Sequence, residues 1–344
     1  MATDLLIVET TLPTPETPPS VSGRGVRTPQ NGPAATKRAD GGRAGHCEIS
    51  ADRTLSAVMS DYLQLTKPRI VVMILVTTIA TALIAAGGWV PLGAMLWLMF
   101  GTAAVAASAG AANQIWERKI DCRMPRTAVR PLPDGRLRVI PSLLFTTLLG
   151  LAGTWALAAR FGWQPAAAGV VTWLLYVLVY TPMKTRTAWN TTVGAVAGAL
   201  PVLIGYTALG GSLADATAWL LVGVLVAWQY PHFMAIAWMY RRQYREAGFR
   251  MTTTEEPTGR SAAIQSIAGS LALIICGVLL CVIPGGLVGA VIASLAVTGF
   301  CLPMLRASIR FASDPCDALA RRLLRSSLLV LPALLLIITV RALW

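Results

Sequence analysis

The chain has 344 residues, of which 55% are hydrophobic and only 13% are charged. This balance lies far from that of a soluble globular protein, so it excludes a soluble fold and predicts an all-α, polytopic membrane bundle. The formal charge of +13 would favour nucleic acid as a partner in a soluble chain. Here the basic residues sort by membrane side, and we expect no nucleic-acid partner.

The first 55 residues differ in composition from the rest. Residues 1–55 are rich in Pro, Gly, Ser, Thr and charge and have no apolar periodicity, which predicts a disordered tail. They lack the basic start and apolar core of a secretory signal. Their arginines leave a mitochondrial transit peptide as a less favoured alternative. Residues 56–344 are predicted to form one transmembrane domain.

Nine apolar stretches follow, each long enough to cross a bilayer as a helix. They cover residues 69–87, 92–115, 138–159, 165–182, 190–210, 214–238, 262–282, 285–304 and 322–342.

The Lys and Arg residues test this count of spans. They gather before the first predicted span and after the second, fourth, sixth and eighth, whereas the opposite side carries only Arg160 and Arg341. The positive-inside rule therefore predicts a cytoplasmic N-terminus and long cytoplasmic loops. We expect a multi-pass protein of the bacterial inner membrane, with the mitochondrial inner membrane as the less favoured alternative.

The second span ends in a polar helical face. Asn113, Glu117 and Asp121 are four residues apart, so they share one side of the helix. Two carboxylates and an amide at this spacing suit Mg²⁺, which commonly leaves coordination positions for phosphate oxygens. The alternative is a solvated helix end, but an amide one turn inside an apolar span normally needs a partner or a function.

Cations follow this face in two predicted cytoplasmic loops. Arg126 and Arg130 lie in the loop after span two, and Lys184 and Arg186 lie in the short turn after span four. Arginine pairs well with phosphate oxygens, so these side chains are candidates for binding a diphosphate. Positive-inside topology is the alternative explanation for the same charges.

The run from Asn113 to Thr127, followed by Arg130-Pro131-Leu132, resembles the first aspartate-rich motif of the heme O synthases, a branch of the UbiA prenyltransferase superfamily. The resemblance covers roughly residues 60 to 335 and has four further blocks. These are residues 65–69, residues 180–187 with Asn190, residues 198–201 and residues 228–233.

The resemblance implies a UbiA-type bundle that transfers the farnesyl group of farnesyl diphosphate to heme b with the help of Mg²⁺. It implies catalytic roles for the residues Asn113, Glu117, Asp121, Arg126 and Lys184, the first three as ligands of a metal–diphosphate complex. It implies substrate contacts by the residues Arg130, Arg186, Tyr180, His232 and Tyr244. For His232, contact with heme and a structural hydrogen bond are both open. A heme A synthase or terminal oxidase assembly factors are expected partners.

The sequence departs from the family pattern at the second acidic motif. Gln243 stands directly before Tyr244, where the family commonly has an acidic residue. A second metal site at this position is therefore in question. Glu256 is a candidate to replace the missing carboxylate, with a cap of the next helix as the alternative.

Two other functions fit parts of the sequence. A UbiA-type enzyme that prenylates an aromatic quinone precursor would need the same diphosphate site, and the blocks at 126–127 and 231–233 favour heme instead. A secondary transporter also has many spans with interrupted helices, but its polar residues gather near the midplane.

Overall fold

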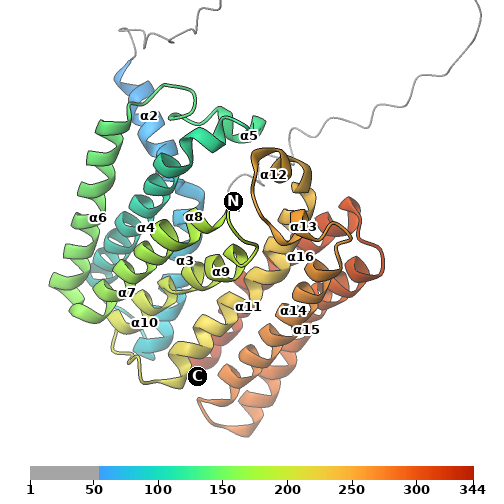
Figure 1. The fold of residues 1–344 in the computed structure, drawn as a ribbon. Helices are drawn as coiled ribbons and strands as arrows, with labels where there is room; N and C mark the ends of the chain where they lie inside the picture. The colour runs from blue at the N-terminus through green and yellow to red at the C-terminus, as the bar shows by residue number, and fades with distance from the viewer. Residues whose placement is uncertain (1–53) are drawn as a thin grey trace, which may run out of the picture. The chain divides into compact units, whose positions relative to one another are not determined.

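The computed structural model describes residues 54–344, which form a helical bundle without strands (Figure 1). Nine of its helices are long and apolar enough to cross a membrane, as predicted. They are Pro68–Ala86, Leu92–Asp121, Val139–Phe161, Trp163–Met183, Asn190–Ala208, Ala216–Met239, Arg260–Val282, Leu287–Ser313 and Asp317–Leu343. The predicted tail lies outside the described residues except for its last two.

The first described helix, α2 (Leu55–Leu65), precedes the spans and was not predicted. Thr54 begins it by accepting a hydrogen bond from the amide of Ala57. On α2, Asp61 is buried and pairs with Arg136 from the loop before α6 (Val139–Phe161). The amide of Gln114 donates to the carbonyl of Leu65 at 2.9 Å. These bonds fix α2 against the end of the second span.

That second span is α4 (Leu92–Asp121), with 30 residues. At 1.5 Å per residue it is about 45 Å long, which exceeds the hydrocarbon thickness of a bilayer. Its last turns can therefore carry charged residues beyond the apolar layer without breaking the helix.

The fourth and fifth spans are interrupted. The helix α7 (Trp163–Leu174) continues through a π-helical segment, Leu175–Tyr180, into the short α8 (Thr181–Met183). The fifth span divides into α9 (Asn190–Ala199) and α10 (Pro201–Ala208), because Pro201 has no amide hydrogen to continue the ladder. Such breaks rotate the side chains that follow them.

The remaining helices complete the bundle. α11 (Ala216–Met239) packs against α9, α14 (Arg260–Val282) and α16 (Asp317–Leu343), while α15 (Leu287–Ser313) packs against α14 and α16. α3 (Pro68–Ala86) contacts α4, α10 and α16, and α4 packs against α6. The first span therefore lies beside the last one.

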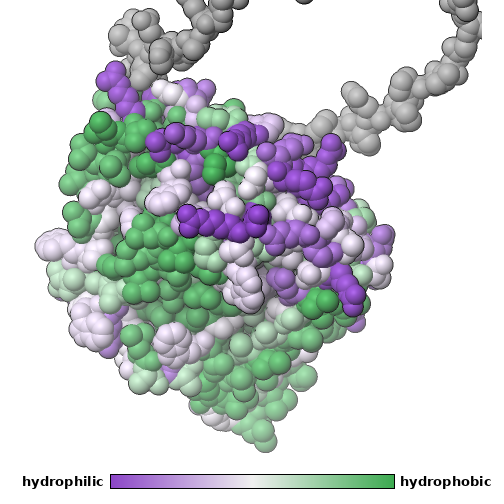
Figure 2. All heavy atoms as spheres, in the orientation of Figure 1, coloured by the Kyte–Doolittle hydropathy of each residue, from purple (hydrophilic) through white to green (hydrophobic). Residues whose placement is uncertain are grey.

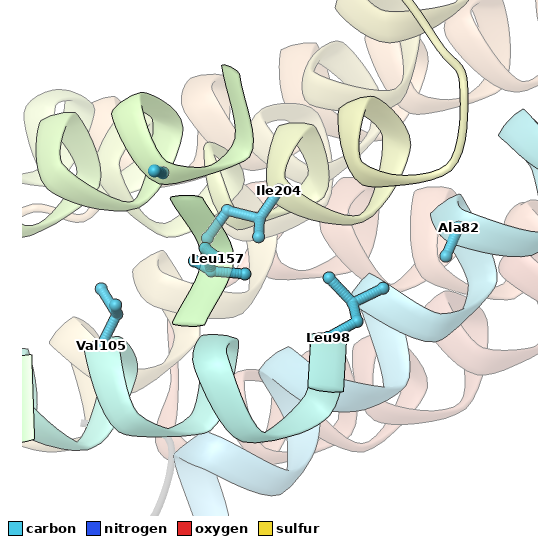
Figure 3. Close-up of a cluster of buried hydrophobic side chains, with 6 residues drawn as sticks. Ala82, Leu98, Val105, Leu157 and Ile204 are labelled. Carbon is cyan, nitrogen blue, oxygen red and sulfur yellow. The ribbon is translucent and has the colours of Figure 1, made fainter. Parts of the chain in front are cut away.

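Apolar residues occupy both the core and the outer face. Figure 3 shows a core cluster in which Leu98 and Val105 of α4 meet Leu157 of α6 and Ile204 of α10. Many large apolar side chains are exposed on the outside, as expected for contact with lipid. Figure 2 shows hydrophilic residues gathered toward the end of the bundle where α5 (Pro125–Ala128) and α12 (Arg241–Ala247) lie.

Candidate active site

The polar face of α4 is buried inside the bundle. Asn113, Glu117 and Asp121 are 0%, 5% and 1% exposed, so the alternative of a solvated helix end does not describe them. Each of these side chains pairs with a cation from a different part of the chain. This set of three acceptors and three cations is called the paired cluster below.

The three pairs are short. The Nζ atom of Lys184 lies 2.6 Å from Oε1 of Glu117, and Nη1 of Arg130 lies 2.9 Å from Oδ2 of Asp121. The Nζ atom of Lys67 donates to Oδ1 of Asn113 at 2.6 Å. Two carboxylates thus face three cations in a buried space, an arrangement suited to an anionic ligand.

Lys67 belongs to this cluster and was not among the predicted site residues. It lies directly before α3 and is the only non-glycine residue with a positive φ within residues 54–344, at 57°. Burial, together with the nearby charge of Arg130, lowers the pKa of Lys67 to about 7. The signals in the sequence were its place before Pro68 at the start of a span and its inclusion in the family block at residues 65–69.

The pKa of Lys184 shifts in the opposite direction to that of Lys67. Burial alone would lower the pKa of its ammonium group, but the attraction of Glu117 outweighs burial and leaves the pKa raised. Its Nζ atom also lies 4.7 Å from the centre of the Tyr180 ring. Lys184 therefore stays protonated beside Glu117.

The π-helical segment positions Tyr180 and Thr181. The hydroxyl of Thr181 donates to the carbonyl of Tyr176 at 2.8 Å and accepts from Nδ2 of Asn113 at 3.0 Å. A glycine on α9 makes room for Tyr180, because a Cβ at Gly194 would lie 2.6 Å from its ring. The π turn thus brings α8 and α9 to the polar face of α4.

Arg126 links two cytoplasmic segments. Its Nη2 atom donates to the hydroxyl of Tyr244 at 3.0 Å, and its guanidinium lies 4.3 Å from the centre of the Tyr240 ring. Tyr244 is buried on α12. The segment after α4 is therefore tied to the segment after α11, at the end of the bundle that holds the paired cluster.

Arg186 and His232 are the two predicted site residues that lie away from both the paired cluster and its neighbours Tyr180, Arg126 and Tyr244. Arg186 is exposed; its amide donates to the carbonyl of Met183 at 2.9 Å, and its carbonyl accepts a hydrogen bond from Arg250 at 3.3 Å. His232 is completely buried on α11, where its Nδ1 lies 2.9 Å from Oγ of Ser327 on α16. No contact in residues 54–344 joins either side chain to the polar face of α4.

The second acidic position has no replacement carboxylate. Glu256 accepts hydrogen bonds from the amides of Thr258 and Ser261, both at 2.9 Å, at the start of α14. These hydrogen bonds, with that from the Thr258 hydroxyl first, lower the pKa of Glu256. Glu256 therefore caps a helix, while the Oε1 atom of Gln243 has no hydrogen-bond partner among the described residues.

The donor set fits a magnesium ion that arrives with phosphate. No group of three or more His, Cys, Asp or Glu side chains able to hold a metal occurs in residues 54–344. Glu117 and Asp121 offer two carboxylates and Asn113 an amide oxygen, which matches the few protein ligands that Mg²⁺ usually takes beside substrate phosphates. The arrangement is suited to a metal–diphosphate complex.

Nine apolar helices and a buried cluster of carboxylates and cations define a multi-pass membrane protein with a site for an anionic ligand. The profile of the UbiA prenyltransferase family matches residues 74–329. The chain belongs to this family, and the predicted fold class is confirmed.

Similar proteins agree with this assignment. A protoheme IX farnesyltransferase of Rhodopirellula baltica is 58% identical over 81% of this chain and 99% of the relative. A solved structure from work on digeranylgeranylglyceryl phosphate synthase in membranes has a TM-score of 0.66 at 15% identity and covers 83% of this chain and 98% of its own. A UbiA homologue of Archaeoglobus fulgidus, bound to GPP and Mg²⁺, has a TM-score of 0.60 at 16% identity, covering 81% and 99%. The two structures show the common fold.

Proposed function

We propose that this chain converts heme b to heme O by transferring the farnesyl group of farnesyl diphosphate to a vinyl group, with addition of water and release of diphosphate. The observation that carries the proposal is the paired cluster, in which three separate segments bring cations to one buried acidic face. The identity to the relative from Rhodopirellula baltica, which spans nearly all of that protein, supports heme b as the acceptor.

The paired cluster provides a way to bind diphosphate. Without ligand, Lys184 and Arg130 neutralise Glu117 and Asp121, and Lys67 donates a hydrogen bond to the amide oxygen of Asn113. When a diphosphate enters, these cations could turn to its oxygens, and Asn113, Glu117 and Asp121 would hold the Mg²⁺ that accompanies it. Bound Mg²⁺ would stabilise the negative charge that develops on the leaving diphosphate.

The reaction needs no nucleophilic side chain. The allylic carbon–oxygen bond breaks and its electron pair leaves with the diphosphate. The vinyl group of heme b supplies the electrons of the new carbon–carbon bond, and water then adds to the resulting cation and loses a proton. The protein's part is to neutralise the leaving group, orient the two substrates and keep water away until the bond has formed.

The polar and apolar parts of the bundle suit the two chemically different ends of the prenyl donor. The paired cluster, with Arg126 and Tyr244 near it, would bind the diphosphate, and the apolar helices would surround the farnesyl tail. Tyr180, whose ring lies beside Lys184, would contact the prenyl donor next to the cluster, and His232 would contact the heme. Arg186, which is exposed, is the candidate least supported by its position.

The site also agrees with the proposed orientation in the membrane. The basic loops that supply Arg130 and Lys184 would face the cytoplasm, where water-soluble Mg²⁺ and diphosphate exchange. We place the chain in the bacterial inner membrane with a cytoplasmic N-terminus. A heme A synthase or terminal oxidase assembly factors would take up its product.

The test is turnover by the purified full chain in lipid nanodiscs with heme b, farnesyl diphosphate and Mg²⁺. We expect a hydroxyethylfarnesyl heme by mass spectrometry and one diphosphate per product. Asp121→Asn should lower kcat/KM by about tenfold or more, because a hydrogen bond to a charged group contributes about 1.5–3 kcal/mol.

The matched control is Asp134→Asn. Asp134 is an exposed carboxylate in the segment between α5 and α6, and it also pairs with an arginine, Arg136. An equal loss of kcat/KM in both variants would show that Asp121 has no special role in turnover. A prenylated aromatic acid as product, with heme b unchanged, would show instead an enzyme of quinone precursor synthesis.

A further inference from the structure

The single histidine of the described chain is held between two helices. The Nδ1 atom of His232 on α11 lies 2.9 Å from Oγ of Ser327 on α16. The indole of Trp228, one turn earlier, stacks on the imidazole with ring centres 4.7 Å apart. The same indole donates from Nε1 to the carbonyl of Ser327 at 2.7 Å. Ser327 therefore holds the imidazole of His232 through its hydroxyl and the indole of Trp228 through its carbonyl.

Counting hydrogens at Ser327 determines the tautomer of His232. The hydroxyl of Ser327 has one hydrogen, and it points to the carbonyl of Leu324 at 2.7 Å. If that hydrogen went to the imidazole instead, two oxygens would face each other at this distance without a hydrogen between them. Both contacts are satisfied only when Nδ1 of His232 carries the proton and donates it to Ser327.

The other ring nitrogen is then an unprotonated base without a partner. Nε2 of His232 is buried, and no described residue forms a hydrogen bond with it, although the side chain is 0% exposed. A buried lone pair without a donor is unfavourable and calls for an explanation. A neutral imidazole whose Nδ1–H is held by a neighbouring oxygen is the usual form of a metal-ligating histidine.

We propose that Ser327 is a positioning residue that holds His232 in the Nδ1–H tautomer and presents its Nε2 to the iron of the heme acceptor. The inference rests on the proposed function for the presence of heme, while the tautomer rests on the hydrogen bonds alone. Trp228 supports the arrangement by covering one face of the imidazole. The iron–nitrogen bond would fix the porphyrin relative to α11 and so limit which edge can approach the prenyl donor.

The tautomer can be measured without heme. The chain has two histidines, so a His46→Ala variant labelled with ¹⁵N-histidine reports His232 alone. We expect its nitrogen spectrum in nanodiscs to show a protonated Nδ1 and an unprotonated Nε2. A protonated Nε2 in this variant would overturn the proposal before any activity is measured.

The iron bond is tested by titrating the same protein with heme b and recording resonance Raman spectra of the ferrous form. We expect an iron–histidine stretching band that is absent in His232→Ala. In Ser327→Ala the band should move to lower frequency, because the imidazole loses the acceptor that makes it a stronger ligand. Heme binding should weaken about tenfold or more, and Ser327→Thr, which keeps the hydroxyl, should restore both.

The matched control is Ser326→Ala. Ser326 is the adjacent serine of α16 and donates to the carbonyl of Leu323 at 2.8 Å, but it has no contact with His232. An identical band in the wild-type chain and in Ser327→Ala would overturn the positioning role. A wild-type chain that makes heme O without any iron–histidine band would overturn the iron contact and leave the proposed function intact. A chain that binds heme with the expected band but transfers no farnesyl group would contradict the proposed function alone.

Discussion

Lys67 combines a strained backbone with a buried charge. A left-handed conformation costs a non-glycine residue about 1–2 kcal/mol, and its φ of 57° places Lys67 in that region. The hydrogen bond from its Nζ to Asn113 explains why lysine occupies the position. Strain of this kind commonly persists at functional sites.

Two substitutions separate these contributions. Lys67→Met and Lys67→Gly should both lower kcat/KM by about tenfold or more, since both remove the cation from Asn113. Lys67→Gly should be the more stable variant by about 1 kcal/mol, because glycine adopts the left-handed conformation without strain. Thermal unfolding in detergent measures the difference, and a less stable glycine variant would show that the backbone of Lys67 is not strained.

For single residues, the sequence predicted correctly which side chains share a helical face, because helical spacing alone determines this. Asn113, Glu117 and Asp121 share a face because they are four residues apart, and the structure buries all three. The partners of these residues are not set by spacing. Lys67 was predicted only as a topology charge, whereas Arg186 was a candidate for binding diphosphate. Only the tertiary fold places Lys67 beside Asn113 and leaves Arg186 exposed. The roles of all these residues stay predictions.

At the scale of the elements, the close contact between α9 and the π-helical segment can be tested by one substitution. A Cβ at Gly194 would lie 2.6 Å from Cε2 of Tyr180, so Gly194→Ala must displace the ring that lies beside Lys184. We expect a loss of about 1–3 kcal/mol in stability from overpacking, together with reduced turnover.

Gly299→Ala on α15 is the control for Gly194→Ala. A Cβ at Gly299 meets nothing within 4 Å, so alanine should leave turnover unchanged and raise helix stability by up to about 1 kcal/mol. Thermal unfolding and turnover measured on both variants compare a close contact with an open one. Equal behaviour would mean that α9 can move away from Tyr180 without consequence.

The cap of α14 predicts a dependence on pH. The lowered pKa of Glu256 means that the folded chain releases this proton more readily than the unfolded chain. The stabilisation is therefore complete above the ordinary value of 4.5 and is lost as the pH falls through the lowered folded value. Glu256→Gln should unfold at a lower temperature than the wild type at pH 7.

The same comparison in strong acid is the internal control. At a pH below the lowered value both side chains are neutral, so the two proteins should unfold at closer temperatures. Thermal unfolding in detergent at both pH values tests this. A difference that stays constant would mean that the carboxylate charge at Glu256 contributes nothing to the cap.

Element boundaries were predictable to different degrees. The nine spans follow from apolar length, because burial in lipid leaves few alternatives to a helix, and most of their ends agree within two residues. The helices Leu92–Asp121, Leu287–Ser313 and Asp317–Leu343 extend beyond the predicted apolar stretches, because charged residues continue them outside the bilayer. The π-helical segment and the division at Pro201 were not predicted. The π-helical segment depends on how α8 packs against α4, which the sequence does not show. A proline alone does not distinguish a bend within a helix from the end of a helix.

For the whole molecule, the odd number of spans predicts termini on opposite sides of the membrane. A tag at the N-terminus should be cut by protease only in inside-out vesicles, and a tag at the C-terminus only in right-side-out vesicles. The reason is the excess of Lys and Arg on the proposed cytoplasmic side. Cleavage of both tags in the same vesicles would contradict nine spans or the orientation.

The internal pairing of the buried charges also bears on how the protein is made. Two carboxylates left alone in an apolar bundle would make insertion and assembly costly, but here one lysine and one arginine from the same chain neutralise them. The newly synthesised protein can therefore reach its final shape before it meets metal or substrate. Cells starved of isoprenoids or magnesium should accumulate the folded protein in normal amounts, ready to work when supply returns.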